Sequence, residues 1–206
     1  MLTLTKSPSS PFVRKARVVA LETGVADQVT LVDTDPWNPD DPLPDTNPLG
    51  KVPALVDGEG QVFAGSTLIC EYLDSLHNGR KVIPESGPER WRVLRLHAMA
   101  DGVMEAAVAR IIEEMRRPKE FLWPGWIDRQ TAKITRTLDV LEAEAAAGRL
   151  QDPPLLGEIA LACALGYLDF RFAVIGWRDG RPALTAWAEG MASRPSLVET
   201  KPYAPQ

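Results

Sequence analysis

Two short segments carry the residue types needed to bind a small, extended, charged ligand. The first, residues 47–55, places Lys51 directly before Val52-Pro53 and a short apolar run. The second begins with Gly65-Ser66, and Ser66 can cap a helix over the residues that follow. If the Val52-Pro53 bond is cis, the N–H and C=O of Val52 point away from the sheet and can pair with another peptide backbone. The pattern therefore predicts a peptide-binding edge.

A third candidate is Ser10, which begins an amphipathic stretch that runs to Gly24. Ser10 as N-cap, Pro11 as first helical residue and Gly24 as stop form a complete helix signature. The Ser10 hydroxyl and the N–H groups of the first turn then point toward a bound anion. Ser10 can equally be an N-cap and nothing more, and Ser7 and Ser9 lie near enough to compete for the anion-binding role.

The composition is that of a soluble globular chain with its own core: 206 residues, 45% hydrophobic and 25% charged. Cys70 and Cys163 lie inside apolar helical patterns, and residues 1–6 carry no signal sequence, so we expect a reduced, cytoplasmic protein. The net charge is -5, and no apolar run is long enough to span a bilayer. Nucleic acid and membrane are therefore not expected as partners. His77 and His97 lack neighbours at metal spacing, so we expect no metal site.

The order of elements predicts two domains. Short strand-like and helix-like runs alternate up to residue 76 in the order βαβ, a long Pro- and Asp-rich loop, then ββα. We expect the loop, residues 33–50, to be irregular, and its length suggests a functional surface. A polar, turn-rich linker follows at residues 77–88. Residues 89–206 read as helices throughout, with helices expected over 89–115, 127–141, 159–175 and 184–191, the third being apolar all round and central.

This arrangement resembles the glutathione S-transferase superfamily, and the resemblance covers nearly the whole chain. It implies a thioredoxin-like α/β domain over residues 1–76 followed by an all-α helical bundle over residues 89–206. The motifs that carry it are short but specific in this order: Ser10-Pro11-Phe12, residues 47–53, residues 71–74, Ala100-Asp101-Gly102 and residues 160–169. The chain is most similar to bacterial serine-type cytosolic transferases, in which Ser-Pro-Phe replaces the Cys-Pro-Phe of thiol-transferring relatives.

The resemblance implies a homodimeric transferase that activates the thiol of glutathione, its co-substrate, for attack on small hydrophobic electrophiles in detoxification. Glutathione-dependent peroxidase activity is a side reaction to be expected, because the reactive sulfur belongs to glutathione. The alternative is a non-catalytic binding or interaction protein of the same fold with weak glutathione affinity. Thiol transfer is a poorer hypothesis, because it needs a cysteine where this chain has Ser10.

Individual site positions also follow from the resemblance. Ser10 is the catalytic residue that stabilises the thiolate. Lys51 is expected to pair with the glycine carboxylate of glutathione, Val52 to hold its cysteinyl backbone, and Ser66 to hold its γ-glutamyl carboxylate. The full set of implied glutathione-binding positions is Ser10, Phe12, Lys51, Val52, Pro53, Gly65 and Ser66, with Ser9, Asp101 and Met104 as further candidates.

Two positions depart from the family pattern. Gly65 stands where relatives usually carry Glu or Asp to meet the α-ammonium of the ligand. Asp101 can supply that charge, from its own subunit or from a partner, or it can simply face solvent. Before Ile159, relatives often have a capping box, of which only Glu158 is present here, so we expect a less well capped helix.

Several apolar residues of the helical domain could line a pocket for the second substrate, next to the sulfur. Core or interface packing is the more common role of such side chains, which are Trp91, Met104, Val108, Met115, Phe121, Trp123 and Trp126. Arg110, Arg116 and Arg117 either form a positive edge that favours anionic electrophiles or make up a solvated helix face.

Overall fold

The computed structural model describes residues 1–204, which form two compact units. The first unit contains Met1–Arg90 together with residues 195–204, and the second contains Trp91–Arg194. The predicted linker at residues 77–88 therefore lies within the first unit, and the segment after residue 194 returns to it.

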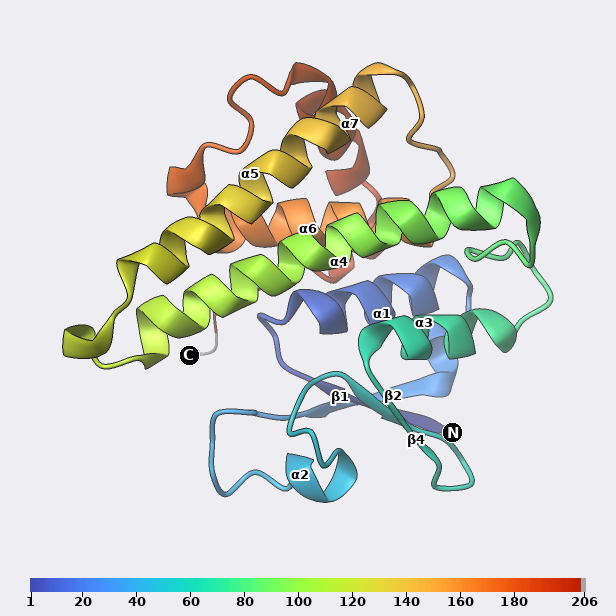
Figure 1. Cartoon of the computed structure of the whole chain (residues 1–206). Helices are drawn as coiled ribbons and strands as arrows, with labels where there is room; N and C mark the ends of the chain where they lie inside the picture. Colours follow the sequence, from blue (N-terminus) through green and yellow to red (C-terminus); the bar gives the residue numbers. More distant parts are fainter. Residues whose placement is uncertain (205–206) are drawn as a thin grey trace. The chain divides into compact units, whose positions relative to one another are not determined.

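A four-stranded mixed sheet forms the centre of the first unit. The strands are β1 (Leu2–Lys6), β2 (Val29–Asp33), β3 (Ala54–Val56) and β4 (Val62–Ala64). Their order is β2-β1-β3-β4, with β1 parallel to β2 and antiparallel to β3, and β3 antiparallel to β4. Helices α1 (Pro11–Glu22) and α3 (Ser66–Ser75) cover one face of this sheet, as Figure 1 shows. The predicted thioredoxin-like βαβ-ββα order is confirmed.

The start of α1 follows its local sequence signals. Ser10 has extended backbone angles, and its hydroxyl oxygen accepts a hydrogen bond from the N–H of Val13 at 3.3 Å. Pro11 occupies the first helical position, where its missing N–H removes nothing from the helix. The apolar face of the helix, including Val13, Ala16 and Val19, is buried. The prediction that Ser10 is an N-cap is confirmed.

The loop between β2 and β3 is more ordered than predicted. A short helix, α2 (Leu43–Thr46), lies within it, and Leu43 is buried there. Our expectation of a wholly irregular segment was wrong at this point. The Pro- and Asp-rich sequence hides the helix, because four residues are too few to show helical periodicity.

The second unit consists of helices. Its long elements are α4 (Gly87–Arg116, which starts in the first unit), α5 (Pro124–Ala146), α6 (Leu156–Arg171) and α7 (Pro182–Ala192), with short 3-10 turns η2 (Lys119–Phe121) and η3 (Ala173–Ile175). Helix α6 is buried along nearly its whole length, as predicted. It begins at Leu156, three residues before the predicted start. At Gly157 an added Cβ would lie 2.9 Å from Leu96 Cβ and from the carbonyl oxygen of Val93, so only glycine allows α4 to approach this closely.

The first turn of α6 is held by half of a capping box. Its N-cap, Leu155, has no side chain that can accept a hydrogen bond, which agrees with the expected weak cap. The fully buried Glu158 compensates, because its carboxylate accepts the N–H of Leu155 at 3.1 Å and pairs with Arg92 at 2.8 Å. The helix start is therefore fixed partly by a residue of α4.

Acid should weaken the second unit through Glu144. Hydrogen bonds from Arg149 and Arg95, each with an attractive charge, hold the pKa of the Glu144 carboxyl below its ordinary value of 4.5. Between pH 4.5, the ordinary pKa of this carboxyl in the unfolded chain, and its lower pKa in the folded protein, the unfolded chain binds more protons than the folded protein. The stability that this carboxylate contributes above pH 4.5 is therefore lost as the pH falls. We expect Glu144→Gln to flatten the dependence of the unfolding midpoint on pH below about 4.5. An unchanged acid limb in urea titrations would contradict this assignment.

Candidate functional site

The Ser10 hydroxyl has one hydrogen-bonding function left over after capping α1. Its oxygen accepts the N–H of Val13, and no described residue accepts its proton. The turn before it is fixed, because the Ser10 N–H donates to the carbonyl oxygen of Ser7 at 3.1 Å. Ser10 is partly exposed and lines a small cavity of about 20 Å³. The group can therefore donate to an anion without giving up its role as a cap.

Asn47 shapes the segment that carries Lys51 and Val52. It is 1% exposed, its side-chain NH₂ donates to the carbonyl oxygen of Lys51 at 2.7 Å, and its side-chain oxygen accepts the N–H of Leu49 at 3.1 Å. Its backbone N–H and C=O are bonded to Leu43 and Gly50. The one side chain thus ties both ends of the turn before β3.

Replacing Asn47 with alanine should loosen this turn. We expect Asn47→Ala to lower the free energy of unfolding by about 1–3 kcal/mol, because it removes two hydrogen bonds of a buried side chain, each worth about 0.5–1.5 kcal/mol. Hydrogen exchange at residues 47–53 should rise together with the KM for the ligand, while the pKa of a bound thiol stays constant. Asn38→Ala is the matched control, since Asn38 makes a similar turn bond to Asp40 N–H in the exposed part of the same loop. Equal effects of the two changes would refute a special role for Asn47.

The backbone of Val52 is available as predicted. The Val52-Pro53 bond is cis, Pro53 is buried, and neither the N–H nor the C=O of Val52 is hydrogen-bonded within residues 1–204. Thr5, in β1, holds the neighbouring strand start, because its hydroxyl accepts the N–H of Ala54 at 2.8 Å. Lys51 is exposed, and its ammonium forms no ion pair with any residue that the structure describes.

The start of α3 differs from the prediction at one position. Gly65, not Ser66, is the N-cap, and Ser66 is the first helical residue. Glycine suits the cap because its φ is 97°, a region that other residues adopt only with strain. Since Gly65 has no side chain, no side-chain cap satisfies the first-turn N–H groups. Ser66 is 7% exposed, and its hydroxyl has no partner among the described residues, so this hydroxyl can donate to a carboxylate at the start of α3.

The structure divides the predicted site residues between the two units. Ser9, Ser10, Phe12, Lys51, Val52, Pro53, Gly65 and Ser66 belong to the first unit, and Asp101 and Met104 belong to α4 in the second. Asp101 lies 3.3 Å from His97 Nε2 one turn earlier, so it has a partner on its own helix.

The residues predicted to line an apolar pocket differ widely in exposure. Met104 is fully buried, whereas Trp91 is 70% and Trp123 is 63% exposed. The rings of Trp123 and Trp126 are stacked, with centroids 6.1 Å apart. The predicted basic edge is not one surface. The Arg110 side chain is only 14% exposed, because it pairs with Glu114, donates to Thr131 of α5 and lies 4.8 Å over the Phe172 ring. Arg117 follows the last residue of α4, is 50% exposed and pairs with Glu113.

Residues 1–204 contain neither a metal-binding cluster nor a membrane-spanning helix. No group of three or more His, Cys, Asp or Glu side chains there is arranged to hold a metal ion. In the same range, no helix is both long and apolar enough to cross a membrane.

Sequence reasoning missed the residues that hold the site in place. Asn47 lies in the motif quoted above, but its role depends on the fold of the turn. Thr5 and Arg14 carry no local signal at all: Thr5 contacts a residue 49 positions away, and Arg14 contacts residues 197 and 200. A buried threonine in a strand and an arginine in the second turn of a helix are each too common to mark a function.

Family models match both halves of the chain, and the chain belongs to the glutathione S-transferase superfamily. Residues 9–76 match the glutathione S-transferase N-terminal domain, and residues 124–190 match the C-terminal domain. The uncharacterized GST-like protein YibF of Escherichia coli K12 is 38% identical over 200 residues, which are 97% of this chain and 98% of YibF.

Solved structures agree with this family. A glutathione transferase family member from Pseudomonas fluorescens Pf-5, with bound glutathione, is 44% identical with a TM-score of 0.93 and covers 99% of this chain and 100% of its own. The same relative was solved with S-(propanoic acid)-glutathione, with a TM-score of 0.90 over 98% of this chain and 100% of its own. A glutathione S-transferase from Methylobacillus flagellatus KT, with glutathione bound, is 34% identical with a TM-score of 0.92, over 98% and 100% of the two chains.

Proposed function

We propose that the protein is a glutathione transferase in which Ser10 activates the thiol of bound glutathione for attack on a small electrophile. The observation that carries this proposal is the unused proton of the Ser10 hydroxyl at the start of α1. The relatives with bound glutathione support it, because they match nearly the whole chain at 34–44% identity.

The chemical task is to keep sulfur ionised at neutral pH. A free thiol has a pKa of about 8.5, and lowering it by two units requires roughly 2.7 kcal/mol of preferential stabilisation of the anion. A hydroxyl bond to an anion supplies about 1.5–3 kcal/mol, and the helix terminus adds about 0.3–1 kcal/mol. Pro11 has no N–H to offer, so the Ser10 hydroxyl carries most of this stabilisation.

Three groups of the first unit fit the rest of glutathione. The Val52 N–H and C=O would pair with its cysteinyl backbone, and the exposed Lys51 with its glycine carboxylate. The γ-glutamyl carboxylate would accept from the Ser66 hydroxyl and the first turn of α3, where no side-chain cap competes. The α-ammonium lacks a carboxylate at Gly65, which weakens this end of the ligand site.

We expect the electrophile to be small. The ligand bound to one relative favours an electrophile that carries a carboxylate. The Pseudomonas fluorescens structure contains S-(propanoic acid)-glutathione, a thioether that carries a short acid. Such a product forms when the thiolate adds to the β-carbon of an acrylate and the α-carbon takes up a proton, or when it displaces halide from a halopropanoate. Acrylate against acrylamide is therefore the informative substrate pair in a screen.

Titration with glutathione tests the proposal. Calorimetry should show binding at or below millimolar glutathione, and the ultraviolet absorbance of bound thiolate should give a thiol pKa below about 8.5. If glutathione does not bind at millimolar concentration, the missing carboxylate at position 65 is decisive. The hypothesis of a non-catalytic binding or interaction protein of the same fold then replaces this proposal.

Gly65→Asp should exchange stability for affinity. The new carboxylate can meet the α-ammonium and tighten glutathione binding by about tenfold, worth about 1.4 kcal/mol. The positive φ of 97° at residue 65 opposes the change and should lower the free energy of unfolding by about 1–3 kcal/mol. Gly65→Ala is the control, because it adds the same strain without the charge. If the Gly65→Asp and Gly65→Ala variants bind glutathione with equal affinity, the α-ammonium of glutathione does not reach residue 65.

A further inference from the structure

The segment after the second unit lies along α1, the helix that begins at Ser10. It consists of α8 (Pro195–Glu199) and the residues 200–204 that follow it, and we refer to residues 195–204 as the strap. We propose that the strap positions Ser10 for thiolate stabilisation, with Arg14 as the residue that joins the strap to α1. This inference rests on the role of Ser10 in the proposed function.

Arg14 makes the central connection. Its Nη2 donates to the carbonyl oxygen of Leu197 at 3.0 Å, and its Nε donates to Thr200 Oγ1 at 3.4 Å. Leu197 and Thr200 are each 3% exposed, so these bonds lie away from solvent. Bonds from an ionised donor are stronger than neutral ones. The arginine, one turn after Ser10, is thereby fixed to two points of the strap.

The strap is also tied at both ends of α1. Near the last turn, Ser196 Oγ lies 2.5 Å from the Glu22 carboxylate and donates to it. Before the first turn, the N–H of Tyr203 donates to the carbonyl oxygen of Pro8 at 3.4 Å. Pro8 belongs to the turn that the bond from Ser10 N–H to Ser7 closes. The strap therefore spans the helix and reaches the turn that orients the Ser10 side chain.

The small cavity beside Ser10 is shared with the strap. Its volume of about 20 Å³ is room for about one water. Ser10 and Arg14 line it from α1, and Thr200 and Tyr203 line it from the strap. A shift of the strap would therefore change the surroundings of the Ser10 hydroxyl directly.

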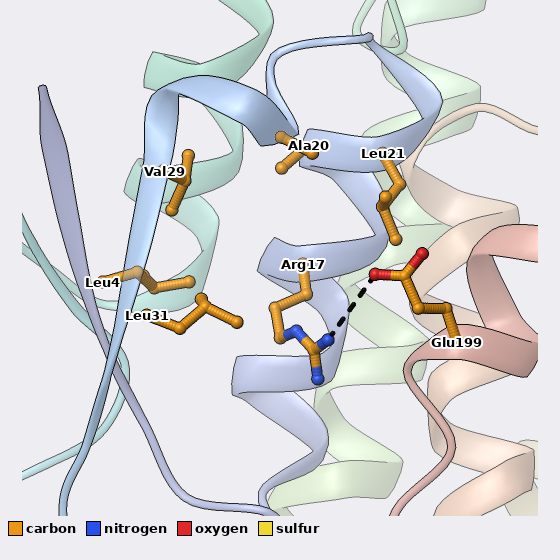
Figure 2. Close-up of a pocket in the computed structure, with 8 residues that line it drawn as sticks. Leu4, Arg17, Ala20, Leu21, Val29, Leu31 and Glu199 are labelled. Carbon is orange, nitrogen blue, oxygen red and sulfur yellow. Dashed lines mark ion pairs between the residues drawn. The ribbon is translucent and has the colours of Figure 1, made fainter.

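A second cavity, of about 90 Å³, lies further along α1, and Glu199 of the strap is one of its lining residues (Figure 2). Leu4 and Leu31 of the sheet line it opposite Ala20 and Leu21 of α1, and Glu199 reaches toward Arg17 from the strap. This ion pair is 3.8 Å long, and the Glu199 side chain is 61% exposed. Exposed pairs of this kind contribute little, so Arg14, not Arg17, is the anchor.

Arg14 can affect a bound thiolate through its positive charge or through its hydrogen bonds to the strap, and a test must separate the two effects. The charged groups that line the cavity beside Ser10 are Lys6, Arg14 and Arg17, of which Lys6 pairs with Asp33 at 2.6 Å and Arg17 with Glu199. Losing Arg14 would remove a positive charge as well as the tie to the strap. Arg14→Lys keeps the charge but not the fixed two-point geometry of the guanidinium. A chain that ends at Thr200 keeps Arg14 and removes the tie from Tyr203 to Pro8.

The experiment compares these two variants with the unmodified chain and with Glu199→Gln, which breaks only the exposed pair. Hydrogen exchange at residues 10–14 reports the order of the turn, and the pH profile of kcat/KM with the ultraviolet absorbance of bound glutathione reports the thiol pKa. In both variants, amide hydrogens at residues 10–14 should exchange faster, and the pKa of the bound thiol should rise by about one unit. This rise should lower kcat/KM about tenfold at low pH, and the loss should disappear at high pH. Glu199→Gln should leave both measurements unchanged.

The inference is overturned if residues 10–14 exchange at the original rate in both variants, or if they exchange faster while the thiol pKa stays constant. Its failure is distinct from failure of the proposed function. If the unmodified protein forms no thiolate, Ser10 has no such role, and the exchange rates alone still decide whether the strap holds the Ser10 turn.

Discussion

Ser10→Ala is expected to reduce kcat/KM by about 10–100-fold at neutral pH and to leave glutathione binding nearly intact. In the proposed mechanism the substitution removes a hydroxyl bond to the thiolate, worth about 1.5–3 kcal/mol, and this loss would raise the thiol pKa by about one to two units. The loss should therefore disappear at a pH above the new pKa, where the thiol ionises without help. The pH profile of kcat/KM and the ultraviolet absorbance of bound thiolate measure the shift.

The same substitution also removes the cap of α1, so stability must be measured beside activity. Loss of an N-cap hydroxyl to alanine costs about 1 kcal/mol, whereas glycine at that position costs only a few tenths. Ser10→Gly should thus lose activity like Ser10→Ala while keeping most of the stability. Ser9→Ala is the neighbouring control and should change neither. If turnover survives in both Ser10 variants, the residue is a cap alone.

Glu158→Gln should produce the largest loss of stability, about 3 kcal/mol or more. Glu158 is fully buried, and its carboxylate accepts hydrogen bonds from Arg92 and from the N–H groups of Leu155 and Gln151. Breaking a buried pair from one side typically costs about 3–5 kcal/mol, because the remaining charge stays buried. The Arg92 side chain is 20% exposed, which places the expected value at the lower end.

Urea unfolding monitored by circular dichroism measures this loss. Asp152→Asn is the control, since Asp152 pairs with Arg194 at 2.7 Å and its side chain is 76% exposed. An exposed pair contributes about 0–1 kcal/mol, so the midpoint should barely move. Similar midpoints for the two variants would show that Arg92 relaxes into solvent once its partner is neutral.

Local sequence signals predicted those parts of the fold that local interactions determine. The cap and first turn of α1 follow from Ser10-Pro11, and the β3–β4 hairpin follows from the Gly-rich turn at residues 57–60. The early start of α6 did not follow, because Leu155 carries no cap signal and Glu158 is held by Arg92, 66 residues away. Tertiary contacts overrode the local pattern there.

The candidate site shows the same division. Ser10, Lys51, Val52 and Ser66 could be named from motifs, because each motif places a chemical group at a helix or strand start. Ser66 was assigned to the wrong helix position, since glycine at a positive φ can replace a side-chain cap. The strap was not predicted at all, because its partner Arg14 lies 183 residues before Leu197 and neither residue marks the other.

The return of residues 195–204 to the first unit makes the second unit an insertion in the sequence of the first. On the ribosome, the sheet and α1 emerge first, but their final contacts cannot form until roughly 100 further residues have been made. At about 5–20 residues per second, that interval is roughly 5–20 seconds. During this interval the face of α1 that binds the strap is uncovered. The strap can cover it only after the whole second unit has been synthesised.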